Sequence, residues 1–228
     1  MRTHIDSYWS SARIGWRVFR TLREAWAGRI ALQASSVCPL DHFMGEAGSA
    51  LADEVANSGG VLGMVATGLG DFDGPMPQAD VQDRLDRFFA LAEDRGLALD
   101  LHIDETGDPR ARMLHAVAST VLHRNFRRPV QCGHCCSLGL QSEEFAAETI
   151  RLCAEAGIAI VALPMCNLYL QGRNPGRTPR WRGITLVHEL RATGVPVSFA
   201  SDNCGDPFYG YGDYDKCPVD AIAHFHTP

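Results

Sequence analysis

The segment Leu99-Asp100-Leu101-His102-Ile103-Asp104-Glu105 decides the fold prediction, because an apolar, strand-like run ends abruptly in a histidine, an aspartate and a glutamate. Three later apolar runs, at residues 129–134, 158–164 and 195–202, end in a similar way. In a barrel of parallel strands, catalytic side chains project from the carboxyl ends of the strands. A neutral imidazole and a nearby carboxylate can serve a metal ion and a proton transfer in one pocket. The series of polar ends therefore predicts a metal-dependent hydrolase.

Apolar runs alternate with helix-like stretches along the whole chain. The expected strands are residues 30–34, 61–66, 97–103, 129–132, 158–163 and 195–200, with a short strand near 1–5, and the expected helices are residues 45–58, 78–95, 108–124, 142–156 and 182–193. Strands that are apolar throughout, each followed by a helix, are typical of parallel β/α units. The pattern predicts about seven such units.

Two α/β architectures can be built from these units, an open doubly wound sheet and a closed (β/α)8 barrel. No glycine-rich dinucleotide fingerprint follows any expected strand, which disfavours the open sheet. Polar residues at the ends of many strands, rather than at one switch point, favour the TIM-type barrel. At 228 residues the chain is slightly short for a barrel, which typically needs about 250 residues.

Composition excludes several classes of partner. The net charge of -6 argues against nucleic-acid binding, and the arginines at 13, 17, 20 and 23 are typical of the solvated face of a helix. No run approaches the ~18 to 20 apolar residues of a membrane span, and no signal peptide is apparent, so we expect a cytoplasmic protein. The eight cysteines are expected to be reduced and mostly structural.

Each polar strand end also has an interpretation without chemistry. His102 could be a hydrogen-bonded core residue in a loop that opens a helix. His134 lies in Cys132-Gly133-His134-Cys135-Cys136, which could be a soft-metal or redox cluster, although no second cysteine pair with zinc-site spacing follows. Asp202 could cap a turn.

Taken together, these residues match a known pattern. The order of five motifs closely resembles the bacterial cytosine deaminase branch of the amidohydrolase superfamily. The motifs are His102-Ile103-Asp104-Glu105, His134, Asn-Leu-Tyr-Leu-Gln-Gly-Arg at 167–173, Trp-Arg-Gly-Ile-Thr at 181–185 and Ser-Asp-Asn at 201–203. The resemblance runs from Arg2 to about Asp213. It implies a distorted (β/α)8 barrel with a small β-sandwich, and one divalent metal ion, iron or zinc.

The resemblance also implies roles for individual residues. His102 and Asp202 correspond to metal ligands, and Glu105 to the acid/base that moves a proton to the ring nitrogen. His134 corresponds to the histidine that orients the attacking hydroxide, and Asp202 also accepts a proton from the water. Gln33 corresponds to a glutamine that binds the substrate's ring amide, for which its amide is suited. The reaction implied is deamination of cytosine or a related cyclic amidine by metal-bound hydroxide, with a nucleobase-like small molecule as partner and a possible homo-oligomer.

The chain departs from the family pattern in two places. The family pattern begins with a metal-binding His-x-His pair at the end of the first strand, but no such pair precedes His102. The late pair at 224–226 resembles it only superficially. Residues 1–215 are therefore expected to form an incomplete barrel without its first strand and most of the β-sandwich, followed by a divergent tail at 216–228. The alternative function is therefore a catalytically inactive fragment. Asn203 stands where the family has a second acid that contacts the substrate. The sequence therefore supports a modified pyrimidine, a triazine or a creatinine-like ring as the substrate to the same degree as cytosine. Hydrolysis of a ring or amide bond is the competing reaction.

Overall fold

Seven parallel strands in chain order form the centre of the computed structural model, which describes residues 1–8, 12–66 and 78–212. One sheet pairs β1 with β2 and a second pairs the remaining five strands in sequence order. Single parallel bridges, Ser35 with Val61 and Pro39 with Val65, join the two sheets into one row. The strands are β1 (Arg2–Asp6), β2 (Gln33–Val37), β3 (Leu62–Ala66), β4 (Leu99–Ile103), β5 (Val130–His134), β6 (Ala159–Ala162) and β7 (Val197–Phe199).

Contacts between β1 and β4 show that this row is curved. The Arg2 guanidinium lies 2.7 Å from the Asp100 carboxylate, and the rings of His4 and His102 meet with centroids 4.4 Å apart. Three spacings of about 4.8 Å separate β1 from β4, so a flat sheet would hold them about 14 Å apart. The strands therefore curl around a common interior as a partial (β/α) barrel, which confirms the predicted fold class.

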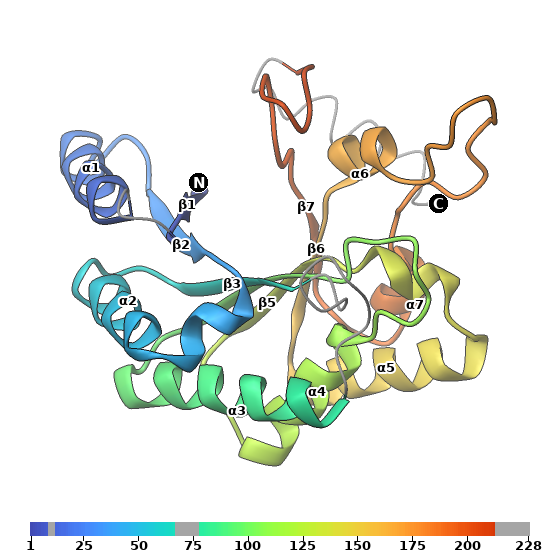
Figure 1. Cartoon of the computed structure of the whole chain (residues 1–228), viewed down its shortest axis with the longest axis horizontal. Helices are drawn as coiled ribbons and strands as arrows, with labels where there is room; N and C mark the ends of the chain where they lie inside the picture. Colours follow the sequence, from blue (N-terminus) through green and yellow to red (C-terminus); the bar gives the residue numbers. More distant parts are fainter. Residues whose placement is uncertain (9–11, 67–77, 213–228) are drawn as a thin grey trace.

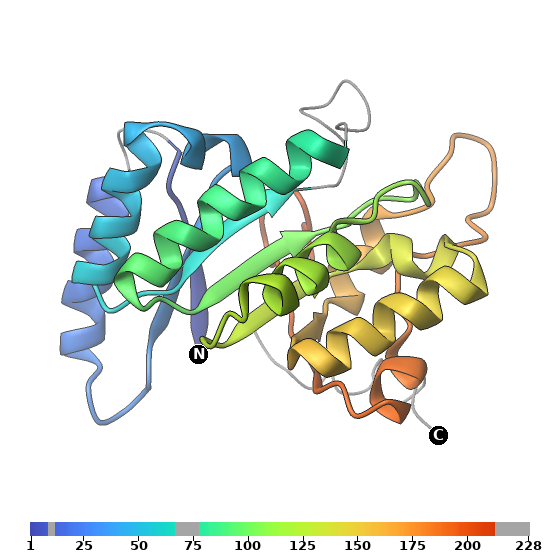
Figure 2. The same ribbon diagram turned by 90° about the horizontal axis from the view of Figure 1, so that it is seen from below.

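Helices cover the outside of the strand row. Figures 1 and 2 show α2 to α5 on one side of the strands, and α1 beside β1 and β2. The helices are α1 (Ala12–Ala25), α2 (Glu46–Asn57), α3 (Gln78–Arg95), α4 (Met113–Arg124), α5 (Glu143–Ala156), α6 (Pro164–Leu170) and α7 (Val187–Ala192), with short 3-10 turns at Leu40–Met44 and Cys136–Leu140. Fully buried aromatic side chains fill the space between the helices and the sheet, and Phe43 packs on Phe88 with a centroid distance of 4.8 Å.

The position of β2 differs from the prediction. The apolar run at 30–34 was expected to be the strand, but Ile30 is exposed and the strand runs through Ser35 and Ser36, both fully buried. The Ser36 hydroxyl accepts a hydrogen bond from the Gly63 N–H at 2.8 Å and donates one to the Gly63 carbonyl at 2.9 Å. Hydroxyl groups that have hydrogen-bond partners can be buried at little cost in free energy. A prediction based on hydrophobicity alone therefore placed this strand about three residues too early.

Three helices also differ. The expected helix at 108–124 begins only at Met113. The expected helix at 182–193 begins at Val187, and Gly183 has a φ of 76° that a helix cannot contain. The short helix α6 was not predicted. The cysteines in the described part of the chain are not joined in disulfides, and all of them except Cys204 are buried. None of the described helices is long and apolar enough to span a membrane. The predicted tail at 216–228 lies outside the described residues.

Candidate active site

Side chains from β4, β5 and α6 form one connected group at the carboxyl ends of the strands. His134, the last residue of β5, places its Nε2 3.3 Å from Nδ1 of His102 on β4. The other nitrogen of His134 lies 3.1 Å from the amide nitrogen of Asn167 on α6 and 3.4 Å from Oε1 of Glu105. The Asn167 amide also donates to Glu105 at 3.2 Å. Strands β4 and β5 therefore bring the predicted His102, Glu105 and His134 together, and α6 adds Asn167.

The backbone at these strand ends adopts a conformation that non-glycine residues rarely take. Asp104, His134, Cys135 and Asp202 have φ values of 55°, 67°, 50° and 64°. Each lies at or just after the end of β4, β5 or β7. Strained residues of this kind concentrate at functional sites. Of the described non-glycine residues with positive φ, the fifth, Asn125, ends α4, so four of the five gather at these strand ends.

Asp104 anchors the loop that carries Glu105. Its two carboxylate oxygens accept hydrogen bonds from the N–H groups of Met113 at 2.9 Å and Leu114 at 2.8 Å, the free donors of the first turn of α4. The side chain is buried, and burial raises its pKa to about 6 despite the two backbone hydrogen bonds. Asp104 therefore acts as a cap that turns the chain from β4 toward α4 and presents Glu105 to the site.

This cap yields a stability prediction. Replacing Asp104 by alanine leaves two buried N–H donors without a partner and should lower the free energy of unfolding by about 1–3 kcal/mol. Urea denaturation at pH 7 measures the change. Asp83→Ala, at an exposed position of α3, is the control and should change stability by less than about 0.5 kcal/mol. Equal losses in the two variants would contradict the capping role.

Burial and neighbouring charges set the protonation of the group. Burial, together with the nearby His4, lowers the pKa of His102 to about 4, and burial with His102 lowers the pKa of His134 to about 3. Both imidazoles are therefore neutral near pH 7. Burial and the charge of Asp202 raise the pKa of Glu105 to about 7. A carboxyl group poised near neutral pH can both take and give a proton.

Asp202, three residues beyond β7, brings a second carboxylate to Glu105. Its Oδ2 is buried and has no hydrogen-bond partner among the described residues, and burial raises the pKa of this carboxyl. Cys166 lies beside both acids, and burial raises the pKa of its thiol. A buried carboxylate oxygen without a partner costs free energy unless a cation or a proton meets it.

Two groups of side chains have the spacing of metal ligands, with ligand atoms within 4.8 Å of one another: His4 with Asp100 and His102, and Glu105 with Cys166 and Asp202. In the first group the Asp100 carboxylate already pairs with the Arg2 guanidinium, whose positive charge opposes a cation. The second group contains the unpartnered Oδ2 of Asp202. A carboxylate oxygen without a partner, beside a second carboxyl and a thiol, fits a divalent cation, so the second group supports a metal at the Asp202 side of the site.

The other predicted site residues have different placements. Asn203 follows Asp202, donates to the Asp206 carboxylate at 2.5 Å and lies within 4.0 Å of the Cys166 sulfur, so it borders the site. Gln33 is exposed at the amino end of β2, where its amide oxygen accepts hydrogen bonds from Arg2. It therefore lies at the wrong end of its strand, because the prediction placed the end of that strand at residue 34. We do not include Gln33 in the site.

Four residues of the site region were not predicted: His4, Asp100, Cys166 and Asn167. Asp100 and His102 share one face of β4 because alternate residues of a strand point the same way, and this signal was present in the sequence. Asn167 opens the motif at 167–173, but nothing in the sequence shows which atoms its amide meets.

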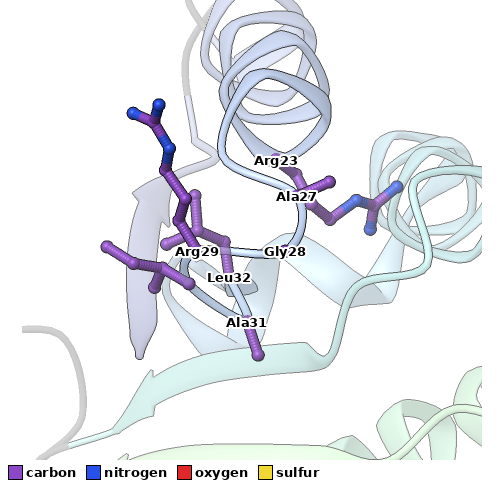
Figure 3. A pocket seen from close by; sticks show the side chains of 7 residues that line it. Arg23, Ala27, Gly28, Arg29, Ala31 and Leu32 are labelled. Carbon is purple, nitrogen blue, oxygen red and sulfur yellow. The ribbon is translucent and has the colours of Figure 1, made fainter.

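A hollow of about 460 Å³ lies elsewhere, beside the turn between α1 and β2 (Figure 3). Its lining residues run from Arg23 to Leu32, just before the amino end of β2. It holds none of the predicted site residues and lies at the end of the strands opposite to Glu105 and His134.

Known proteins resemble this chain in sequence and in fold. A model of the family described as "Amidohydrolase family" matches residues 24–216. A pterin deaminase of Rhizobium rhizogenes is 50% identical over 220 residues, covering 96% of this chain and 48% of that protein. The structure of 5-methylcytosine deaminase from Klebsiella pneumoniae with 5-fluorocytosine superposes with a TM-score of 0.83 at 25% identity, covering 98% of this chain and 52% of that one. The structure of N-isopropylammelide isopropylaminohydrolase from Burkholderia multivorans superposes with a TM-score of 0.69 at 25% identity, covering 93% of this chain and 49% of that one. The chain spans about half the length of these relatives.

Proposed function

Because the chain belongs to the amidohydrolase family, we propose that it supplies the catalytic groups of a metal-dependent deaminase, which hydrolyses the bond between a carbon of a nitrogen heterocycle and its exocyclic amine. The observation that carries this proposal is the poised carboxyl of Glu105 between the neutral His134 and the carboxylate of Asp202, whose Oδ2 has no hydrogen-bond partner among the described residues. Deamination moves two protons from the attacking water, one to the ring nitrogen and one to the leaving amine, and the first transfer needs an acid/base group beside the ring. Glu105 is the residue that we assign to this task.

His102 and Asp202 are the residues that would hold the metal, whose identity as iron or zinc stays a prediction. When bound there, a divalent cation acts as a Lewis acid that makes water ionise near neutral pH. His134, buried and held by Asn167, orients the attacking water beside Glu105. Glu105 would take the first proton of this water and pass it to the ring nitrogen, and Asp202 would take the second proton, which the leaving amine then receives.

Pterin is the first substrate that we propose, because the pterin deaminase of Rhizobium rhizogenes is 50% identical to this chain over 220 residues. Cytosine and 5-methylcytosine are the second, supported by the TM-score of 0.83. Asn203 is neutral and cannot accept a proton, so it suits a neutral ring edge rather than a cationic amidine.

Release of ammonia tests the proposal. The purified chain, supplied with Zn²⁺ or Fe²⁺, should release one ammonia per pterin consumed, as followed by a coupled ammonia assay and mass spectrometry of the product. A ring-opened product without ammonia would favour the competing ring hydrolysis. No turnover of pterin, cytosine or 5-methylcytosine with bound metal would favour the alternative of an inactive fragment.

A further inference from the structure

We propose that Gln171 is a positioning residue, which holds the backbone of Glu105 in place. The side-chain amide of Gln171 donates a hydrogen bond to the Glu105 carbonyl oxygen at 3.3 Å. A backbone carbonyl only accepts hydrogen bonds, so the amide nitrogen must face it, whatever the protonation of the nearby side chains. The structural part of this inference stands without the proposed function, on which only its catalytic consequence rests.

Helix α6 approaches Glu105 at two points. Gln171 directly follows α6, and its N–H still bonds to the Asn167 carbonyl at 2.9 Å, so the side chains of these two residues lie one turn apart on one helix face. The Asn167 amide lies 3.2 Å from Oε1 of Glu105. One helix face therefore contacts Glu105 at its backbone, where the side chain begins, and at its carboxyl group, where the side chain ends.

A neighbouring segment, residues 181–183, packs against the Gln171 side chain. Gly183 has a φ of 76°, and a Cβ added there would lie 2.6 Å from Cβ of Gln171 and closer still to its Cγ. A Cβ added at Gly172 would overlap the Trp181 carbonyl oxygen. Protein interiors are packed too closely to absorb such overlaps without a shift of the neighbouring atoms. The motifs at 167–173 and 181–185 therefore form one packed unit, which leaves the Gln171 side chain little freedom to move.

The same unit also contacts the chain beyond Glu105. The Trp181 ring lies against Gly107, where an added Cβ would be 3.0 Å from the ring carbon Cζ3. On the other side of Glu105, the Asp104 carboxylate caps helix α4. The loop that carries Glu105 is thus held before, at and after this residue. Gln171 supplies the contact at the Glu105 backbone itself.

This placement has a consequence for proton transfer. A general acid/base must lie within hydrogen-bond reach of the group that it serves, and a displacement of about 1 Å can lower a rate about 100-fold. Without the Gln171 amide, the backbone of Glu105 loses its hydrogen bond on the α6 side. The hydrogen bonds of Gln171 reach Glu105 and Asn167, and neither is a predicted metal ligand. Loss of this amide should therefore change the rate and not the metal content.

Carbonyl NMR on the purified chain tests the contact directly. The pair Glu-Thr occurs twice, at 105–106 and 148–149, so labelling glutamate with ¹³C at the carbonyl and threonine with ¹⁵N gives one signal for Glu105 and one for Glu148 within α5. Gln171→Met keeps the length of the side chain but removes the donor, so the Glu105 carbonyl signal should move upfield and the Glu148 signal should stay. Gln82→Met, which removes an amide from α3, is the matched control and should change neither signal.

Kinetics tests the catalytic consequence. In Gln171→Met, the rate of ammonia release should fall by about 10–100-fold, with KM and metal content near those of the parent chain. The same substitution in a Glu105→Gln chain should cause no further loss, because Gln171 acts through the Glu105 carboxyl. A purely structural role would lower the rate by the same factor in both chains and would contradict the proposal.

Gln171→Asn gives a second measurement if Gln171→Met does not fold. Its amide is one CH₂ group too short to reach the Glu105 carbonyl, so the Glu105 signal should move as it does in Gln171→Met. An unchanged Glu105 signal in the folded variants would overturn the inference. The carbonyl signal does not depend on turnover, so a parent chain without deaminase activity would count against the proposed function and leave this test intact.

Discussion

Glu105→Gln should lower the rate of ammonia release by about 10²–10⁴-fold, the range usual for loss of a general acid/base. The glutamine amide has the same shape and its oxygen can still accept the hydrogen bond from Asn167, but it cannot take up or return a proton. The substitution therefore changes proton transfer and little else. Steady-state kinetics with pterin, together with metal analysis of the same preparation, measures both quantities.

Metal content decides how this result is interpreted. We expect Glu105→Gln to keep the metal content of the parent chain, because the predicted ligands are His102 and Asp202. Glu155→Gln makes the same change on the exposed face of α5, where Glu155 pairs with Arg151, and should keep full activity. If Glu105→Gln retains most of its rate, the acid/base assignment is wrong.

Asp202→Ala should lose both metal and activity, with bound metal falling from near one ion per chain to a small fraction. The physical reason is the buried Oδ2, which no described group meets and which a cation would satisfy. Without this oxygen, the site loses the carboxylate that balances the charge of a divalent ion. Inductively coupled plasma mass spectrometry of dialysed protein gives the metal content directly.

The control for this experiment is Asp53→Asn, which removes a carboxylate from α2 where it pairs with Arg95 at the surface. Its metal content and rate should equal those of the parent chain. Circular dichroism distinguishes lost metal from lost fold in Asp202→Ala. A folded Asp202→Ala chain with unchanged metal content would remove Asp202 from the set of ligands.

Much of the site could be predicted because its residues follow recognisable strands. Strand β4 is an apolar run with one clear end, so His102 and Glu105 were placed at the correct rim. The same reasoning placed His134 at the end of β5 and Asp202 just beyond β7. These strand ends could be predicted because parallel strands that are buried on both faces give continuous apolar runs in the sequence.

The failures have a different physical origin. Gln33 was assigned to the site through the family resemblance, and the apolar run at 30–34 placed it near the end of a strand, whereas the strand begins at Gln33 and contains the buried Ser35 and Ser36. A hydroxyl that finds a backbone partner is as easily buried as a methyl group, and the sequence does not show the partner. Asn167 was missed for the same reason, because its importance depends on two atoms from other elements.

The sequence by itself determined the order of the β/α units, the rim on which the polar residues lie and the family to which the chain belongs. The first two depend on local periodicity and on the type of residue at each strand end, and the family on the resemblance carried by motifs such as those at 102–105, 167–173 and 181–185. Only the tertiary structure decided that Asp202 has an unmet carboxylate oxygen, that Arg2 neutralises Asp100, and that Asn167 joins Glu105 to two histidines. Such properties depend on burial and on contacts between residues distant in sequence, since desolvation and hydrogen bonding act on atoms that only folding brings together.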